Sequence, residues 1–63
     1  MTGIDAYPVR CRKNIRKLSH LLCTDYQTAY AMMLLTATLM DLHPNDQKVI
    51  DMILTDCKVE VVM

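Results

Sequence analysis

Apolar residues recur every three or four positions over a long central stretch of the chain. The series runs through Ile15, Leu18, Leu22, Tyr26, Ala29, Met33, Ala37 and Met40. Because an α-helix turns once in about 3.6 residues, this spacing places the whole series on one helical face. No glycine or proline interrupts the chain between Val9 and His43. The pattern therefore predicts one continuous helix from about residue 12 to residue 42.

A competing signal lies in the middle of this stretch. The segment Thr24-Asp25-Tyr26-Gln27 matches a capping box, in which a threonine hydroxyl accepts a backbone N–H and a glutamine side chain reaches back. A cap there would divide the stretch into a basic helix that ends near Leu22 and an apolar helix that begins after Thr24. We expect the continuous helix, because the apolar series crosses Thr24 without a change of phase.

A second, shorter helix is expected after the turn at His43-Pro44-Asn45. Proline disfavours helical backbone in the residue before it, and Asn45 or Asp46 can cap a new helix. Apolar residues then return on one face. We predict a short helix over residues 45–57.

The end of the chain has the pattern of a β-strand. Residues 58–62 are rich in valine and nearly alternate between polar and apolar side chains, which predicts a short strand. A weaker strand candidate lies at residues 7–12, where Pro8 counts against it. The predicted fold class is mostly α, with two helices and one short strand.

These elements leave apolar surface that one copy of the chain cannot cover. Hydrophobic residues make up 52% of the 63 residues. For a chain of 7.2 kDa, apolar burial contributes roughly 90 kcal/mol, and ordering the chain costs about the same. Over residues 26–42 apolar side chains fall on both sides of the helix, and a lone strand needs a partner. We therefore expect residues 1–63 to form a single small dimerising domain, an intertwined homodimer.

The expected dimer interface draws apolar residues from both helices and the strand. These residues are Leu18, Leu22, Tyr26, Tyr30, Met33, Leu35, Leu39, Met40, Ile50, Ile53, Leu54, Val59 and Val61.

Charge is distributed unevenly along the chain, although seven basic and seven acidic residues cancel. A basic segment near the N-terminus comprises Arg10, Arg12, Lys13, Arg16 and Lys17. Such a segment can bind nucleic-acid phosphates, an anionic membrane surface or an acidic protein. The simplest interpretation is a solvated face that keeps an apolar dimer in solution. Among partners, we expect an acidic protein before nucleic acid, and we expect no membrane.

Motifs for catalysis, metal binding or cofactor binding are lacking. His20 and Cys23 are three residues apart, and His43 and Cys57 are the nearest further ligand types, but no Cys-x-x-Cys pair exists. The chain has no glycine-rich loop for a phosphate, and Cys23 has no obvious activating base. We expect a non-enzymatic protein without metal or cofactor. Three cysteines without a secretory segment indicate the cytoplasm.

Three segments carry a resemblance to a known family: Met1–Pro8, Tyr26–Leu35 and the turn His43–Asp46. Through them the chain resembles a family of small early proteins of lambda-like temperate bacteriophages, encoded between the exonuclease and excisionase genes. The resemblance extends over essentially the whole chain and includes no catalytic motif. It implies a dimer of two helices and one strand per chain, made early in infection in the host cytoplasm, that hastens lytic development and lowers host survival.

Two functions follow as expectations. The first is a non-enzymatic early phage protein that promotes lytic development by binding an unidentified host or phage protein through an apolar helical surface. The alternative is a dimeric nucleic-acid-binding regulator that uses the segment from Arg10 to Lys17.

Overall fold

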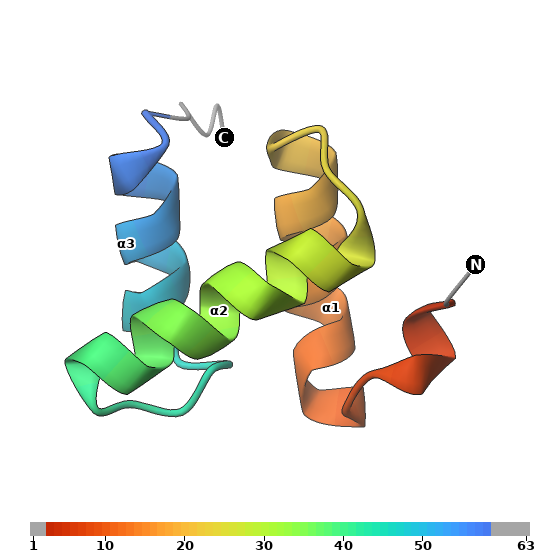
Figure 1. The fold of residues 1–63 in the computed structure, drawn as a ribbon, viewed down its shortest axis with the longest axis horizontal. Helices are drawn as coiled ribbons and strands as arrows, with labels where there is room; N and C mark the ends of the chain where they lie inside the picture. The colour runs from red at the N-terminus through yellow and green to blue at the C-terminus, as the bar shows by residue number, and fades with distance from the viewer. Residues whose placement is uncertain (1–2, 59–63) are drawn as a thin grey trace.

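Within residues 3–58 the chain folds into three α-helices preceded by one short 3₁₀ turn (Figure 1). The computed structural model describes residues 3–58. The elements are η1 (Ile4–Ala6), α1 (Val9–Leu21), α2 (Tyr26–Met40) and α3 (Gln47–Asp56). In Figure 1, α1 and α3 stand on either side and run in the same direction, and α2 crosses in front of both. The expectation of a mostly helical fold is confirmed.

The predicted continuous helix over residues 12–42 is wrong, because the chain turns between α1 and α2. Cys23 takes a left-handed backbone conformation with φ of 52°. The N–H of Thr24 donates to the carbonyl oxygen of Ser19 at 2.9 Å, and the N–H of Cys23 donates to that of His20 at 3.4 Å. This pair of bonds is the Schellman motif that closes a helix C-terminus. The longest dimension of the molecule is consequently 28 Å, against about 46 Å for a straight helix over residues 12–42.

Helix α2 begins with a cap from Asp25. The carboxylate Oδ1 of Asp25 accepts the backbone N–H of Thr28 at 2.8 Å. The break that the capping-box alternative indicated is therefore present, with the capping residue one position after Thr24. Hydrogen bonding to Thr28, through its side chain and its backbone N–H, lowers the pKa of Asp25.

The other two helices also end at non-glycine residues in the left-handed region. Asp41 has φ of 57° and Lys58 has φ of 54°. After α2, the N–H of Leu42 donates to the carbonyl oxygen of Ala37 at 2.9 Å, which repeats the Schellman bond. Glycine normally occupies such positions, but the single glycine of the chain is Gly3. The usual sequence marker of a helix end is therefore missing from all three ends.

The predicted short helix over residues 45–57 corresponds to α3, which Asp46 caps by accepting the N–H of Lys48 at 2.9 Å. The alternative strand over residues 7–12 is wrong, because α1 begins at Val9 and is helical through that stretch. Of the strand predicted over residues 58–62, Lys58 is in a turn, and residues 59–62 lie outside the described residues.

The core forms where α2 lies across α1 and α3. Its buried residues are Cys11, Ile15, Leu18, Ala29, Met33, Ala37, Val49, Ile50, Ile53 and Leu54. On α2 the small Ala29 and Ala37 lie one turn on either side of Met33, which lets the neighbouring helices approach closely. The apolar face predicted for this helix is confirmed, since these three residues are its buried ones.

Candidate interaction surfaces

Helix α2 carries an apolar outer face that no described residue covers. Leu35 and Leu39 are 68% and 87% exposed, and Leu34 is 39% exposed. With Ala31 and the partly buried Met32, these residues form the surface that we call the α2 outer face. No charged residue lies between positions 26 and 40. Single exposed leucines are common on proteins, but a set aligned along one uncharged helix is typical of a contact surface.

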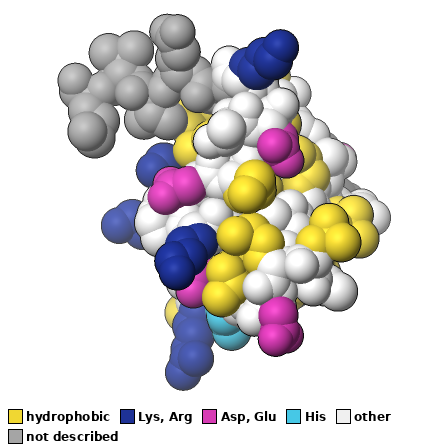
Figure 2. Space-filling view, turned by 90° about the vertical axis from the view of Figure 1, so that its left-hand side faces the viewer, with side chains coloured by type: hydrophobic (Ala, Val, Ile, Leu, Met, Phe, Trp, Pro, Cys, Tyr) yellow, Lys and Arg dark blue, Asp and Glu magenta, His cyan; other side chains and the backbone are white. Residues whose placement is uncertain are grey.

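Hydrophobic and basic side chains lie in different regions on the side of the molecule that Figure 2 shows. Hydrophobic side chains form a band through the middle and right of this view, and most of its Lys and Arg side chains project at the left-hand edge. On α3, Met52 is the exposed large hydrophobic residue, at 41%. On this side of the molecule the exposed apolar side chains and most of the basic ones thus lie in different regions (Figure 2).

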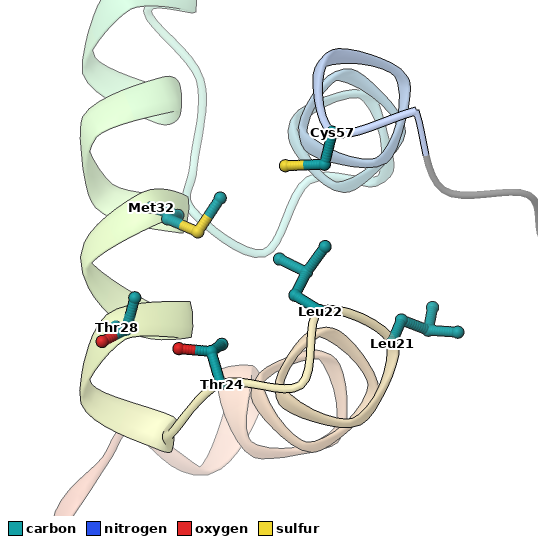
Figure 3. Close-up of a pocket in the computed structure, with 6 residues that line it drawn as sticks. All are labelled: Leu21, Leu22, Thr24, Thr28, Met32 and Cys57. Carbon is teal, nitrogen blue, oxygen red and sulfur yellow. The ribbon is translucent and has the colours of Figure 1, made fainter.

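A groove of about 430 Å³ lies beside α2, at the C-terminal ends of α1 and α3 (Figure 3). Its lining residues are Leu21, Leu22, Thr24, Thr28, Met32 and Cys57. The side chains of Leu22, Met32 and Cys57 point toward the space between the three helices. Because Met32 also belongs to the α2 outer face, the groove continues that apolar surface.

Helix α1 presents a basic outer face. Arg10, Lys13, Arg16, Lys17 and His20 are exposed, and helical spacing gathers them within about a third of the helix circumference. The sequence of α1 contains no acidic residue. We call these five residues the α1 basic face.

Arg12, which the sequence places in the same basic segment, has a structural role instead. Its Nε donates to the carbonyl oxygen of Tyr7 at 3.0 Å, and its guanidinium also donates to the carbonyl oxygen of Asp5 at 3.1 Å. The Tyr7 ring packs edge-on against Tyr30 of α2, with centroids 5.2 Å apart. Arg12 and Tyr7 therefore hold η1 against the helices.

The structure divides the predicted interface residues into groups by exposure. Leu18, Met33, Ile50, Ile53 and Leu54 are buried in the core of the chain itself, while Leu22, Tyr26, Tyr30 and Met40 are partly buried against it. Leu35 and Leu39 are exposed. Val59 and Val61 lie outside the described residues.

Several residues of these surfaces were not predicted from the sequence. Leu34 and Met52 are exposed but were not among the predicted interface residues. The groove residues Leu21 and Cys57 were missed as well, because the groove exists only where the chain turns between α1 and α2. A continuous helix would leave no such space.

The thiol and imidazole groups of the described residues lie in different surroundings. Cys11 is buried, and burial raises the pKa of its thiol, which makes it less reactive. Nδ1 of His43 accepts the backbone N–H of Asn45 at 3.0 Å in the turn before α3. Among residues 3–58 no three His, Cys, Asp or Glu side chains are grouped closely enough to hold a metal ion. Over the same residues, each helix is too short or too polar to cross a membrane.

Comparison with known proteins identifies no relative of this chain. No protein-family model, no curated protein and no solved structure matches the chain.

Proposed function

We propose that this protein catalyses no reaction and acts by binding other proteins through the α2 outer face, beginning with a second copy of itself. The observation that supports this most strongly is the exposure of Leu35 and Leu39 at 68% and 87%. Full burial of a leucine side chain contributes about 1.5 to 3 kcal/mol. Two such leucines from each of two copies would contribute about 6 to 12 kcal/mol, which is comparable to the entropic cost of association.

The spacing on α2 favours another helix as the contacting element. On α2, Met32, Leu35 and Leu39 are separated by three and four residues. That is the a/d spacing with which two helices pack side by side. A second α2 across a two-fold axis supplies an identical seam, and two-fold dimers are the commonest protein assemblies.

The resemblance to small early proteins of lambda-like temperate bacteriophages supplies a setting for this proposal. In that setting the dimer forms in the cytoplasm of an infected host and binds a host or phage protein, and the complex promotes lytic development. The groove at Leu22 and Met32 and the exposed Met52 are further apolar contact points for that second protein.

A double substitution on α2 tests the proposal. In sedimentation velocity, Leu35→Ser/Leu39→Ser should shift the mass from twice 7.2 kDa to 7.2 kDa. Its far-ultraviolet circular dichroism should stay helical, because both side chains are exposed in the single chain. Val9→Ser is the matched control, since Val9 is 73% exposed on α1 and its loss should leave the dimer intact. A double variant that sediments like the unaltered dimer would refute this use of the α2 outer face.

A further inference from the structure

The α1 basic face has the chemistry of a surface for phosphate groups. From Arg10 to His20 the helix rises about 15 Å, which is close to the axial rise of four base pairs of duplex DNA. Arg10, Lys13, Arg16 and Lys17 follow one another along this length and are all exposed. We infer that α1 binds the phosphate backbone of duplex DNA, a property separate from the protein association proposed above.

These cations are available to a ligand. Within residues 3–58 the only ion pair joins Arg12 to Asp5, at 3.9 Å, so the donors of the α1 basic face carry no ion-pair partner there. Pro8 supplies no side-chain cap to α1, and its first turn contains no acidic residue. The positive end of the helix dipole therefore adds to the charge near Arg10.

The composition of the face favours DNA over an acidic protein. Protein interfaces centre on apolar or aromatic anchor residues and are depleted in lysine. The one exposed large hydrophobic residue among the described residues of α1 is Val9, at its first position. Contacts to phosphates need no such anchor, because they consist of charge and hydrogen bonds.

Duplex DNA also fits better than single-stranded nucleic acid. Single strands are held largely by bases that stack on aromatic side chains. Helix α1 has no aromatic residue. A helix is about 10 to 12 Å wide, which matches the major groove of duplex DNA at about 12 Å.

Fluorescence anisotropy with a labelled DNA duplex of about 20 base pairs tests the inference. Contacts to about four phosphates predict that the affinity falls on the order of a hundred-fold between about 50 mM and about 200 mM salt. Lys13→Glu/Arg16→Glu should abolish binding at the lower salt and keep its helical circular dichroism, since both side chains are exposed. The matched control is Lys48→Glu/Lys58→Glu, which changes the net charge equally but outside α1 and should weaken binding less than about three-fold.

Four results would overturn the inference. They are absence of duplex binding at about 50 mM salt, an equal loss in the Lys48→Glu/Lys58→Glu control, equally tight binding of the separated single strands, and competition by polyglutamate as strong as by unlabelled duplex. The last result would assign the α1 basic face to an acidic protein. None of these outcomes depends on the α2 outer face, so the two proposals fail or succeed separately.

Discussion

Replacing Cys23 with glycine should make this protein more stable. Cys23 has φ of 52°, a left-handed conformation that costs a residue with a side chain about 1 to 2 kcal/mol. Glycine avoids that cost but loses about 0.5 to 1 kcal/mol more in conformational entropy on folding. Taking the middle of each range, the net gain is about 0.5 to 1 kcal/mol. Little is lost with the thiol, because Sγ is exposed and lies 3.9 Å from the carbonyl oxygen of His20.

The sign of the effect distinguishes the two descriptions of residues 12–42. If the helix were continuous, glycine at position 23 would stand in a helix interior and destabilise the protein by about 1 kcal/mol. In the Schellman turn between α1 and α2 it relieves strain. Cys23→Gly therefore tests the turn on which the fold and the groove depend.

Thermal unfolding followed by circular dichroism at a fixed protein concentration is the assay. For a domain of this size 1 kcal/mol corresponds to about 4 to 8 °C, so the midpoint should rise by about 2 to 8 °C. Asp41→Gly should give a smaller rise, because Asp41 also has a positive φ, of 57°, but aspartate tolerates the left-handed region better than cysteine. Cys23→Ala removes the thiol, keeps the strain and should leave the midpoint unchanged. A lower midpoint for Cys23→Gly would refute the reasoning.

Three further predictions concern the cap, the core and η1. Because the pKa of folded Asp25 lies below its ordinary 3.8, ionised Asp25 stabilises the protein above that value and loses this effect as the pH falls through the folded-state pKa. Asp25→Asn keeps a capping oxygen but cannot ionise. In urea titrations its free energy of unfolding should therefore fall less between about pH 6 and about pH 2 than that of the unaltered protein. An equal fall in both proteins would contradict the cap. Ile15→Ala removes a fully buried side chain and should cost about 2 to 5 kcal/mol in urea unfolding, whereas a loss below about 1 kcal/mol would place Ile15 outside the core. Arg12→Ala removes the hydrogen bond to the carbonyl oxygen of Tyr7, so hydrogen exchange at the Tyr7 amide should speed up while exchange in α2 stays unchanged. An equal acceleration in α2 would show that the substitution destabilises the whole protein and not η1 alone.

The three buried residues of α2 all belong to the apolar series that the sequence predicts on one helical face. Ala29, Met33 and Ala37 repeat at helical spacing and occupy the core, and Leu35 and Leu39 on the other side are exposed. The end of α1 could not be predicted in the same way. The apolar series keeps its phase across Cys23, and the turn is made by a cysteine in a conformation that usually needs glycine.

The turn between α1 and α2 also explains why some of the predicted interface residues are buried in the single chain. Because α1 folds back against α2, the chain covers more of its own apolar surface than a long helix with one short partner could. Leu18 and Met33, expected at a dimer interface, are therefore in the core of the single chain. The groove beside Leu22 arises from the same turn. Surfaces that depend on tertiary packing could not be located from spacing alone.

Sedimentation equilibrium of the unaltered protein across micromolar concentrations tests most directly whether the α2 outer face joins two copies. If Leu35 and Leu39 are contact residues, the mass-average value should rise with concentration toward twice 7.2 kDa. A folded, helical protein that stays at 7.2 kDa over the whole range would show that these leucines do not bind a second copy.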